Sequence, residues 1–241
     1  MTELVAYESA GPIARLTMDD GKLNVMSKAM LQALHGAFDR AERDRAIVLL
    51  GGRAQVFSAG FDLKVFGRGD PDEIYQMMRL GAELALRVLS FPLPVVTLCT
   101  GHAFPMGAFL LLGADVRLGA DGPFQIGLNE VAIRLTIPGF GVELARQRLT
   151  PAYFNRIATG ELLAPAEAAV AGYLDRVVAP EQLTASADSV AGALGKIDLA
   201  AHAATKARVR APAIQAVRAA IDAEITLAAY RQRAERPTAR R

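Results

Sequence analysis

The sequence twice places a buried strand, a turn of small residues and the start of a helix in the same order. Residues 46–52, AIVLLGG, lead into QVFSAGFDLKVF, and residues 94–99, PVVTLC, lead into TGHAFPMGAFLLLGAD. Short apolar runs that end near glycine are typical of strands covered on both faces of a sheet. Such strands, alternating with helical segments, predict an α/β domain. No other feature of the chain constrains its fold as strongly.

The spacing of apolar residues predicts the other elements. Residues 4–9 and 12–18 alternate as two strands around the turn at Gly11-Pro12, and Ser27 is a favourable N-cap for the amphipathic helix that follows it. Further strands are expected at 115–120, 124–127 and 173–178, and further helices at 71–90, 139–149, 150–160, 165–172 and, after Pro180, through PAIQAVRAAIDAEITLAAYRQ.

The composition narrows the class of protein. With 241 residues, 52% of them hydrophobic, the chain is long enough for a substantial core. Its one cysteine, Cys99, excludes an internal disulfide and a cysteine-rich zinc site, and no HExxH or EF-hand spacing points to another metal. The N-terminal residues lack a targeting signal and the apolar runs are too short for a bilayer. We therefore expect a cytoplasmic protein without metal or membrane contact.

Charge and motifs argue against further classes. Residues 201–241 hold nine Lys and Arg against three Asp and Glu, but we interpret the final RQRAERPTARR as a solvated tail rather than a nucleic-acid-binding surface. GFGVEL lacks the third glycine of a dinucleotide fingerprint, and the chain has neither a P-loop nor GxSxG. The motifs of NAD enzymes, nucleotide triphosphatases and serine hydrolases are therefore missing.

One carboxylate, Glu130, stands in the otherwise apolar or carboxamide stretch FQIGLNEVAI. Burial of a lone ionised acid costs several kcal/mol or raises its pKa toward neutrality, where it can take and return a proton. The two turns after the buried strands offer unpaired backbone N–H groups that suit a negatively charged oxygen. The alternatives are that Glu130 caps a turn beside Asn129 and that both turns are ordinary connections.

In their order and spacing, these stretches resemble the enoyl-CoA hydratase/isomerase, or crotonase, superfamily. The resemblance runs from PIARLTMDDGKLNVMSKAML through FSAGFDLKVF, GHAFPMGAF, IGLNEVAI and IPGFGVELARQRLT to LLAPAEAAVAGYLDRVV. It implies an α/β fold with a crotonase-type spiral of ββα turns over residues 1–194 and a C-terminal helical trimerisation region over 195–241. It also implies an acyl-CoA thioester substrate, no separate cofactor, and a homotrimer or a dimer of trimers.

The resemblance also implies roles for individual residues. The backbone N–H groups of Phe61 and Met106 would form an oxyanion hole, although the family often has glycine where Met106 stands. Glu130 would be the catalytic acid and base, and the preceding IGLN resembles mitochondrial-type 3,2-enoyl-CoA isomerases in particular. The residues implied in CoA binding are Lys22, Leu23, Asn24, Ala59, Asp62, Leu63 and Lys64, of which Lys64 has a solvated surface charge as its alternative.

Two positions in the implied acyl pocket bear on the reaction. Phe109 stands where hydratases have their second glutamate, and Arg134 stands where related sequences usually have glycine. Because isomerisation needs one base whereas hydration usually needs two carboxylates, we predict a 3-enoyl to trans-2-enoyl-CoA isomerase. Hydration of 2-enoyl-CoA is the alternative, and a non-catalytic acyl-CoA- or RNA-binding protein is a further one. Arg134 is interpreted either as structural or as the partner of a polar acyl chain.

The assembly prediction has a pattern of its own. Small residues crowd the segment after residue 195, and an apolar stripe follows them at near-helical spacing. The small residues are Ala200, Ala203, Ala204, Ala207, Ala211 and Ala213, and the stripe is Ile214, Val217, Ile221, Ile225 and Leu227. We expect this stripe to contact a neighbouring subunit, the alternative being that it folds onto the core of its own chain.

Overall fold

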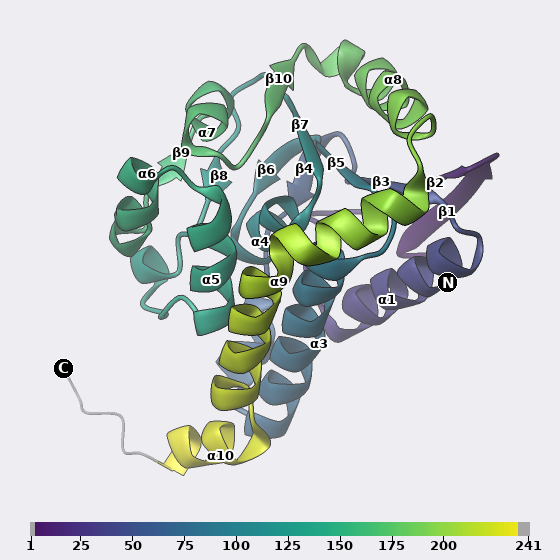
Figure 1. Ribbon diagram of the computed structural model, residues 1–241. Helices are drawn as coiled ribbons and strands as arrows, with labels where there is room; N and C mark the ends of the chain where they lie inside the picture. Colours follow the sequence, from purple (N-terminus) through teal and green to yellow (C-terminus); the bar gives the residue numbers. More distant parts are fainter. Residues whose placement is uncertain (1–2, 236–241) are drawn as a thin grey trace.

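A computed structural model describes residues 3–235, and its strands form two sheets (Figure 1). The six-stranded sheet has the order β1-β2-β3-β5-β7-β10, and the four-stranded sheet has the order β4-β6-β8-β9. Neighbouring strands are parallel except in the pairs β1–β2 and β8–β9. The strands are β1 Val5–Ala10, β2 Ile13–Met18, β3 Ile47–Gly51, β4 Gln55–Ser58, β5 Val95–Cys99, β6 Gly101–Ala103, β7 Val116–Ala120, β8 Ile126–Gly127, β9 Leu162–Leu163 and β10 Arg176–Val178.

The helices follow these strands in a repeating order. The chain passes from β3 in the large sheet to β4 in the small sheet and then into α2 and α3, and the series β5, β6, α4 and β7, β8, α5 repeat this path. The helices are α1 Lys28–Arg43, α2 Leu63–Arg68, α3 Pro71–Ser90, α4 Pro105–Gly113, α5 Gly139–Arg148, α6 Pro151–Arg156, α7 Pro165–Ala171, α8 Leu183–Leu194, α9 Leu199–Glu224 and α10 Leu227–Glu235, with 3-10 turns η1 Val131–Ile133, η2 Ile157–Thr159 and η3 Pro180–Gln182. The predicted α/β fold of ββα turns with a helical C-terminal region is thus confirmed.

Local sequence explains where the long helices begin. The Ser27 hydroxyl accepts the Met30 N–H at 3.2 Å and caps α1, as predicted. Asp70 caps α3 in the same way, and Pro71 occupies its first position, where a missing N–H costs nothing. Among residues 3–235, no helix is both long enough and apolar enough to cross a lipid bilayer.

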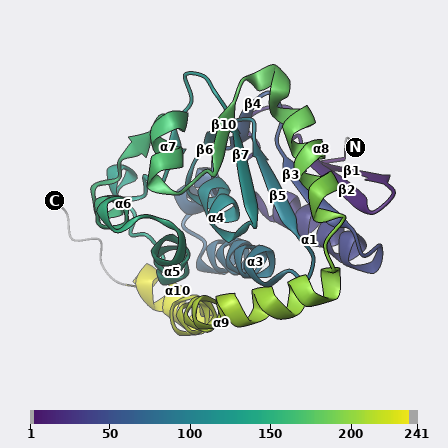
Figure 2. The ribbon, with the colours of Figure 1, turned by 45° about the horizontal axis from the view of Figure 1, so that its top comes forward.

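The large sheet is covered on both faces, which is why its central strands read as unbroken apolar runs. Along β3, Val48 and Leu50 pack in the main core with α1, α3 and α4, while Ile47 and Leu49 pack in a second cluster with α8. Figure 2 shows α8 on one side of this sheet and α1 and α3 on the other. Successive side chains of a strand point to opposite faces, so each face of β3 meets its own layer of helices.

A buried group of charges fastens α9 to the rest of the molecule. Asp115 accepts from the Lys206 ammonium at 2.6 Å and from the Arg210 guanidinium at 2.8 Å. Arg210 also donates to the carbonyls of Leu89, at 2.9 Å, and Gly113, at 2.8 Å. These carbonyls belong to the last turns of α3 and α4, where a cation is favourable. The helix continues through Pro212 without interruption.

The apolar stripe of α9 lies inside its own chain. Val217, Ile221 and Ile225 are 0%, 0% and 2% exposed and belong to the main core. Figure 1 shows α9 alongside α3 and α5. The stripe therefore packs on the core of its own chain, which was the alternative to a contact with a neighbouring subunit. Assembly into trimers stays a prediction that rests on the family resemblance.

The expected continuous C-terminal helix is wrong. α9 ends at Glu224, and α10 begins at Leu227, where the Thr226 hydroxyl accepts the Ala229 N–H at 3.2 Å. An ion pair between Arg231 and Asp72 at 2.8 Å holds α10 against α3. The segment interpreted as a solvated tail is helical over residues 231–235, and residues 236–241 lie outside the described part.

Candidate active site

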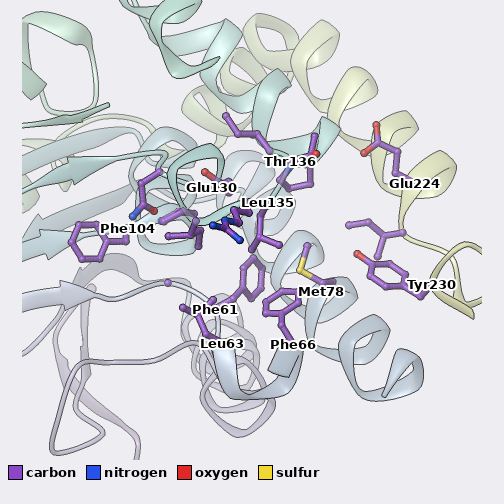
Figure 3. A pocket seen from close by; sticks show the side chains of 18 of the residues that line it. Phe61, Leu63, Phe66, Met78, Phe104, Glu130, Leu135, Thr136, Glu224 and Tyr230 are labelled. Carbon is purple, nitrogen blue, oxygen red and sulfur yellow. The ribbon is translucent and has the colours of Figure 1, made fainter. Parts of the chain in front are cut away.

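A cavity of about 570 Å³ lies between the two glycine turns, residues 129–138 and the corner between α9 and α10 (Figure 3). This volume suits a small organic ligand. Phe61, Phe66 and Met78 form an apolar wall opposite Glu130 and Leu135 in the view of Figure 3. The polar residues that line the cavity are Asn129, Glu130, Arg134, Thr136, Glu224, Tyr230 and Arg233.

The first turn leaves one backbone N–H free at the cavity. The Ala59 N–H donates to the Leu23 carbonyl at 2.9 Å, and the Gly60 N–H donates to the Ser58 hydroxyl at 3.1 Å. The next amide, that of Phe61, has no acceptor among residues 3–235. Gly60 has φ +86°, a conformation that side chains rarely adopt, so glycine is required for this shape.

The second turn repeats this arrangement at the start of α4. The Phe104 N–H donates to the Ser58 carbonyl at 2.9 Å, and Pro105 has no N–H. The first helical bond is made by the Ala108 N–H, which leaves the Met106 amide unpaired within the described chain. An unpaired amide at a helix start carries partial positive charge and suits an anionic oxygen.

Close packing brings the two turns together at Ser58. A Cβ atom on Gly107 would lie 2.9 Å from the Cβ of Ser58, so a glycine there lets α4 approach the first turn. The Met106 side chain is buried, and its sulfur would lie 3.2 Å from a Cβ on Gly81. Methionine at this position therefore packs into the core and leaves its N–H available.

Glu130 is buried without a compensating partner. It is 5% exposed, and neither of its carboxylate oxygens has a hydrogen-bond partner within residues 3–235. Burial raises the pKa of Glu130 to about 7. Burial and, to a smaller extent, the charge of Glu130 also raise the pKa of Tyr173. Near neutral pH, the Glu130 carboxyl is thus poised both to take and to release a proton.

The local backbone holds Glu130 at the edge of a short turn. Its carbonyl accepts the N–H groups of Ile133 at 3.0 Å and Leu135 at 2.8 Å, and its own φ and ψ are helical. The turn ends at Arg134, whose φ of +65° is left-handed. These bonds fix the Glu130 backbone while its side chain reaches the cavity.

The structure brings some of the predicted site residues together and places others elsewhere. Ala59, Phe61, Leu63, Glu130 and Arg134 line the cavity. The predicted residues whose side chains are not in this lining are Lys22, Leu23, Asn24, Asp62, Lys64, Met106 and Phe109.

Three of the predicted residues outside the cavity lining have structural roles. The Asn24 amide donates to the carbonyls of Met18 at 3.0 Å and Phe57 at 3.2 Å. Asp62 caps α2 by accepting the Lys64 N–H at 2.9 Å. The Phe109 ring is fully buried, with its centroid 5.1 Å from that of Phe140.

Sequence reasoning missed several residues at or beside the cavity. Ser58 joins three segments, because its hydroxyl donates to the Asn24 carbonyl at 2.7 Å and its own carbonyl accepts the Phe104 N–H at 2.9 Å. Glu224 adds a second carboxylate, one oxygen of which accepts the Gly139 N–H at 2.8 Å. Tyr230 and Arg233 reach the cavity only because the chain turns between α9 and α10. The small residues around Ser58 were a usable sequence signal for this turn. No sequence signal pointed to Glu224, Tyr230 or Arg233.

A buried carboxylate and an unpaired amide at one cavity suit chemistry that moves a proton beside a carbonyl group. This chain belongs to the enoyl-CoA hydratase/isomerase family, whose model matches residues 8–237. The predicted family is therefore confirmed.

Individual relatives agree with this assignment. A probable enoyl-CoA hydratase of Bacillus subtilis is 31% identical over 159 residues, which make up 64% of this chain and 59% of that protein. A crystal structure of an enoyl-CoA hydratase/isomerase family protein from Pseudomonas syringae has a TM-score of 0.90 at 43% identity, covering 92% of this chain and 96% of that one. The human mitochondrial delta3-delta2-enoyl-CoA isomerase has a TM-score of 0.84 at 26% identity, covering 96% and 97%.

Proposed function

We propose that the protein is an enzyme that shifts the double bond of a 3-enoyl-CoA thioester to give trans-2-enoyl-CoA. The observation that carries this proposal is the single buried carboxylate of Glu130, with its pKa near 7, at a cavity that also adjoins the free amide of Phe61. A pKa near the working pH lets one group remove and return a proton.

The reaction can be followed on the residues of this site. The Glu130 carboxylate takes a proton from C2 of the acyl group, and the electron pair moves onto the thioester oxygen to give a dienolate. The Phe61 and Met106 N–H groups donate to that oxygen, a contribution of about 3–4 kcal/mol for one donor. The dienolate then takes the proton back from Glu130 at C4, which leaves the double bond between C2 and C3.

Hydration of a 2-enoyl-CoA is the second candidate, and one observation favours it. Glu224 brings another carboxylate to the cavity, and hydration usually employs two such groups. However, one oxygen of Glu224 accepts the Gly139 N–H. At Phe109, where the family resemblance would place the second hydratase glutamate, the side chain is apolar and fully buried. Isomerisation therefore fits this chain better.

The remaining site and assembly predictions belong to the same proposal. Coenzyme A is expected beside the first turn, where Leu23 and Leu63 are 55% and 56% exposed, with Lys22 and Lys64 near its phosphates. The expected assembly is a homotrimer or a dimer of trimers, so light scattering should give three or six times the 25.6 kDa of one chain. A mass of 25.6 kDa in solution would contradict this expectation.

Parallel assays on 3-hexenoyl-CoA and crotonyl-CoA test the reaction. Glu130→Gln should lower isomerase turnover by about 10²- to 10⁴-fold, because the general base is lost. Glu8→Gln is the matched control, since Glu8 is an exposed residue of β1. Faster hydration than isomerisation by the unaltered protein would favour the second candidate. If Glu130→Gln changed neither reaction while CoA esters still bound, the non-catalytic alternative would hold.

A further inference from the structure

Two arginines line the cavity without a carboxylate partner in the described part of the chain. Arg134 follows η1 and Arg233 lies on α10, and both line the cavity. Within residues 3–235 neither guanidinium forms an ion pair with a carboxylate. Their charges are therefore available to a ligand that enters the cavity.

The carboxylates of the same cavity do not neutralise them. Glu130 is only four residues from Arg134, yet its two oxygens have no partner in the described chain. One carboxylate oxygen of Glu224 accepts the Gly139 N–H. Oppositely charged groups that share a cavity without pairing leave each free for a separate part of the substrate.

The backbone of Arg134 is a second, independent observation. Its φ of +65° is left-handed, a region that disfavours a large side chain and favours glycine. A strained residue whose side chain lines a cavity points to a functional reason for keeping that side chain. Arg45 has the same type of conformation, with φ +51°, but it is not among the residues that line the cavity.

α10 holds the second arginine in a defined place. The guanidinium carbon of Arg233 lies 5.2 Å from the centroid of the Tyr230 ring, and Tyr230 itself packs near Tyr75 of α3. The neighbouring Arg231–Asp72 ion pair ties the same helix to α3. Arg233 is thus presented by a docked helix.

We propose that Arg134 and Arg233 form an anion-binding subsite that holds a negatively charged oxygen group of the thioester substrate. The group is a carboxylate on the acyl chain, which a guanidinium binds through charge-assisted hydrogen bonds. The inference rests on the proposed function in taking the ligand to be an acyl-CoA thioester. It adds a charged recognition element to a cavity whose other walls are largely apolar.

Calorimetric binding of four saturated thioesters tests the subsite without requiring turnover. The probes are adipyl-CoA and hexanoyl-CoA, which differ by a terminal carboxylate, and the corresponding pantetheine thioesters, which lack the nucleotide phosphates. Arg134→Gly and Arg233→Gln should each raise the dissociation constant of the affected probes about tenfold, as expected for the loss of a charge-assisted bond. Arg134→Gly retains a residue suited to the left-handed conformation, and Arg45→Gly is its matched control.

The pattern of losses identifies the anion. Weaker binding of both adipyl thioesters, with hexanoyl thioesters unaffected, assigns the subsite to an acyl carboxylate. Weaker binding of both CoA esters, with the pantetheine esters unaffected, would mean that the arginines contact a CoA phosphate, and would overturn the proposal. Equal binding of all four probes to variant and unaltered protein, or equal losses for all four, would overturn the proposal. So would the same losses in Arg45→Gly. Failure of the isomerase assay alone would leave these binding patterns intact and would count against the proposed reaction only.

Discussion

Replacement of Glu130 by glutamine should change the stability of the folded protein relative to the unaltered protein, and this change should be more stabilising at alkaline pH than at acidic pH. The folded-state pKa of Glu130 is about 7, against 4.5 for an ordinary glutamate. The folded protein therefore holds this proton more tightly than the unfolded chain does. Below about pH 4.5 the group is protonated in both states and costs nothing extra, whereas its ionisation opposes folding as the pH rises toward 7.

The size of the effect follows from the two pKa values. They differ by about 2.5, and each pKa unit corresponds to about 1.4 kcal/mol, so ionised Glu130 costs the folded state about 3 kcal/mol. Glutamine has nearly the same shape and cannot ionise. A buried amide without partners carries its own penalty, but that penalty does not change with pH. The pH dependence of the stability difference therefore isolates the carboxylate.

Urea unfolding of both proteins between about pH 4.5 and pH 8 measures this difference. The free energy of unfolding of Glu130→Gln minus that of the unaltered protein should rise by about 3 kcal/mol across this range. Glu8→Gln, on an exposed part of β1, should show no such rise. In the same range, kcat/KM of the unaltered enzyme should increase through about pH 7, because the free carboxylate is the base.

A stability difference that stays flat with pH would refute the reasoning, because it would mean that Glu130 ionises in the folded protein as it does in the unfolded chain. A flat stability difference combined with a kinetic pKa near 7 would locate the titrating group elsewhere. If the stability difference and kcat/KM give the same pKa, both measurements report the ionisation of the Glu130 carboxyl group.

Other substitutions test the packing around the site. Asp115→Asn leaves Lys206 and Arg210 buried without their counter-charge, so urea unfolding should show a loss of about 3–5 kcal/mol, and a loss below about 1 kcal/mol would contradict the buried pairing. Ser58→Ala strips partners from two backbone groups and should cost about 1–3 kcal/mol and lower kcat; unchanged kcat would show that the two turns keep their positions without this hydroxyl. Tyr230→Ala opens the α10 side of the cavity and should lower the KM for longer acyl chains relative to shorter ones, which a panel of thioesters would detect.

Much of the fold was predictable because local sequence and burial agree. β3 and β5 are buried on both faces, and their mainly apolar sequences predict this burial. α1 begins at Ser27, a residue whose side chain favours that position. Glu130 was found because an acid in an apolar run is costly unless it has a use.

The small sheet and the C-terminal corner were not predictable in the same way. β4 and β6 hold four and three residues, too few for an alternating pattern, and their pairing depends on contacts between distant segments. The break between α9 and α10, at Thr226, follows AAIDAEI, a stretch with no glycine or proline to signal it. Residues such as Thr226 serve helix interiors and caps alike, so tertiary packing decides between them.

The cavity combines groups that local sequence positions with groups that long-range packing positions. The groups that would carry the chemistry, the amides of Phe61 and Met106 and the carboxylate of Glu130, come from turns that local sequence specifies. The groups that complete the cavity wall, Tyr230 and Arg233, come from a helix whose position depends on long-range contacts with α3. A change in how α10 docks would alter what the cavity accepts while leaving the amides and the carboxylate in place. We therefore expect substrate choice in this chain to depend on residues that a motif comparison does not reach.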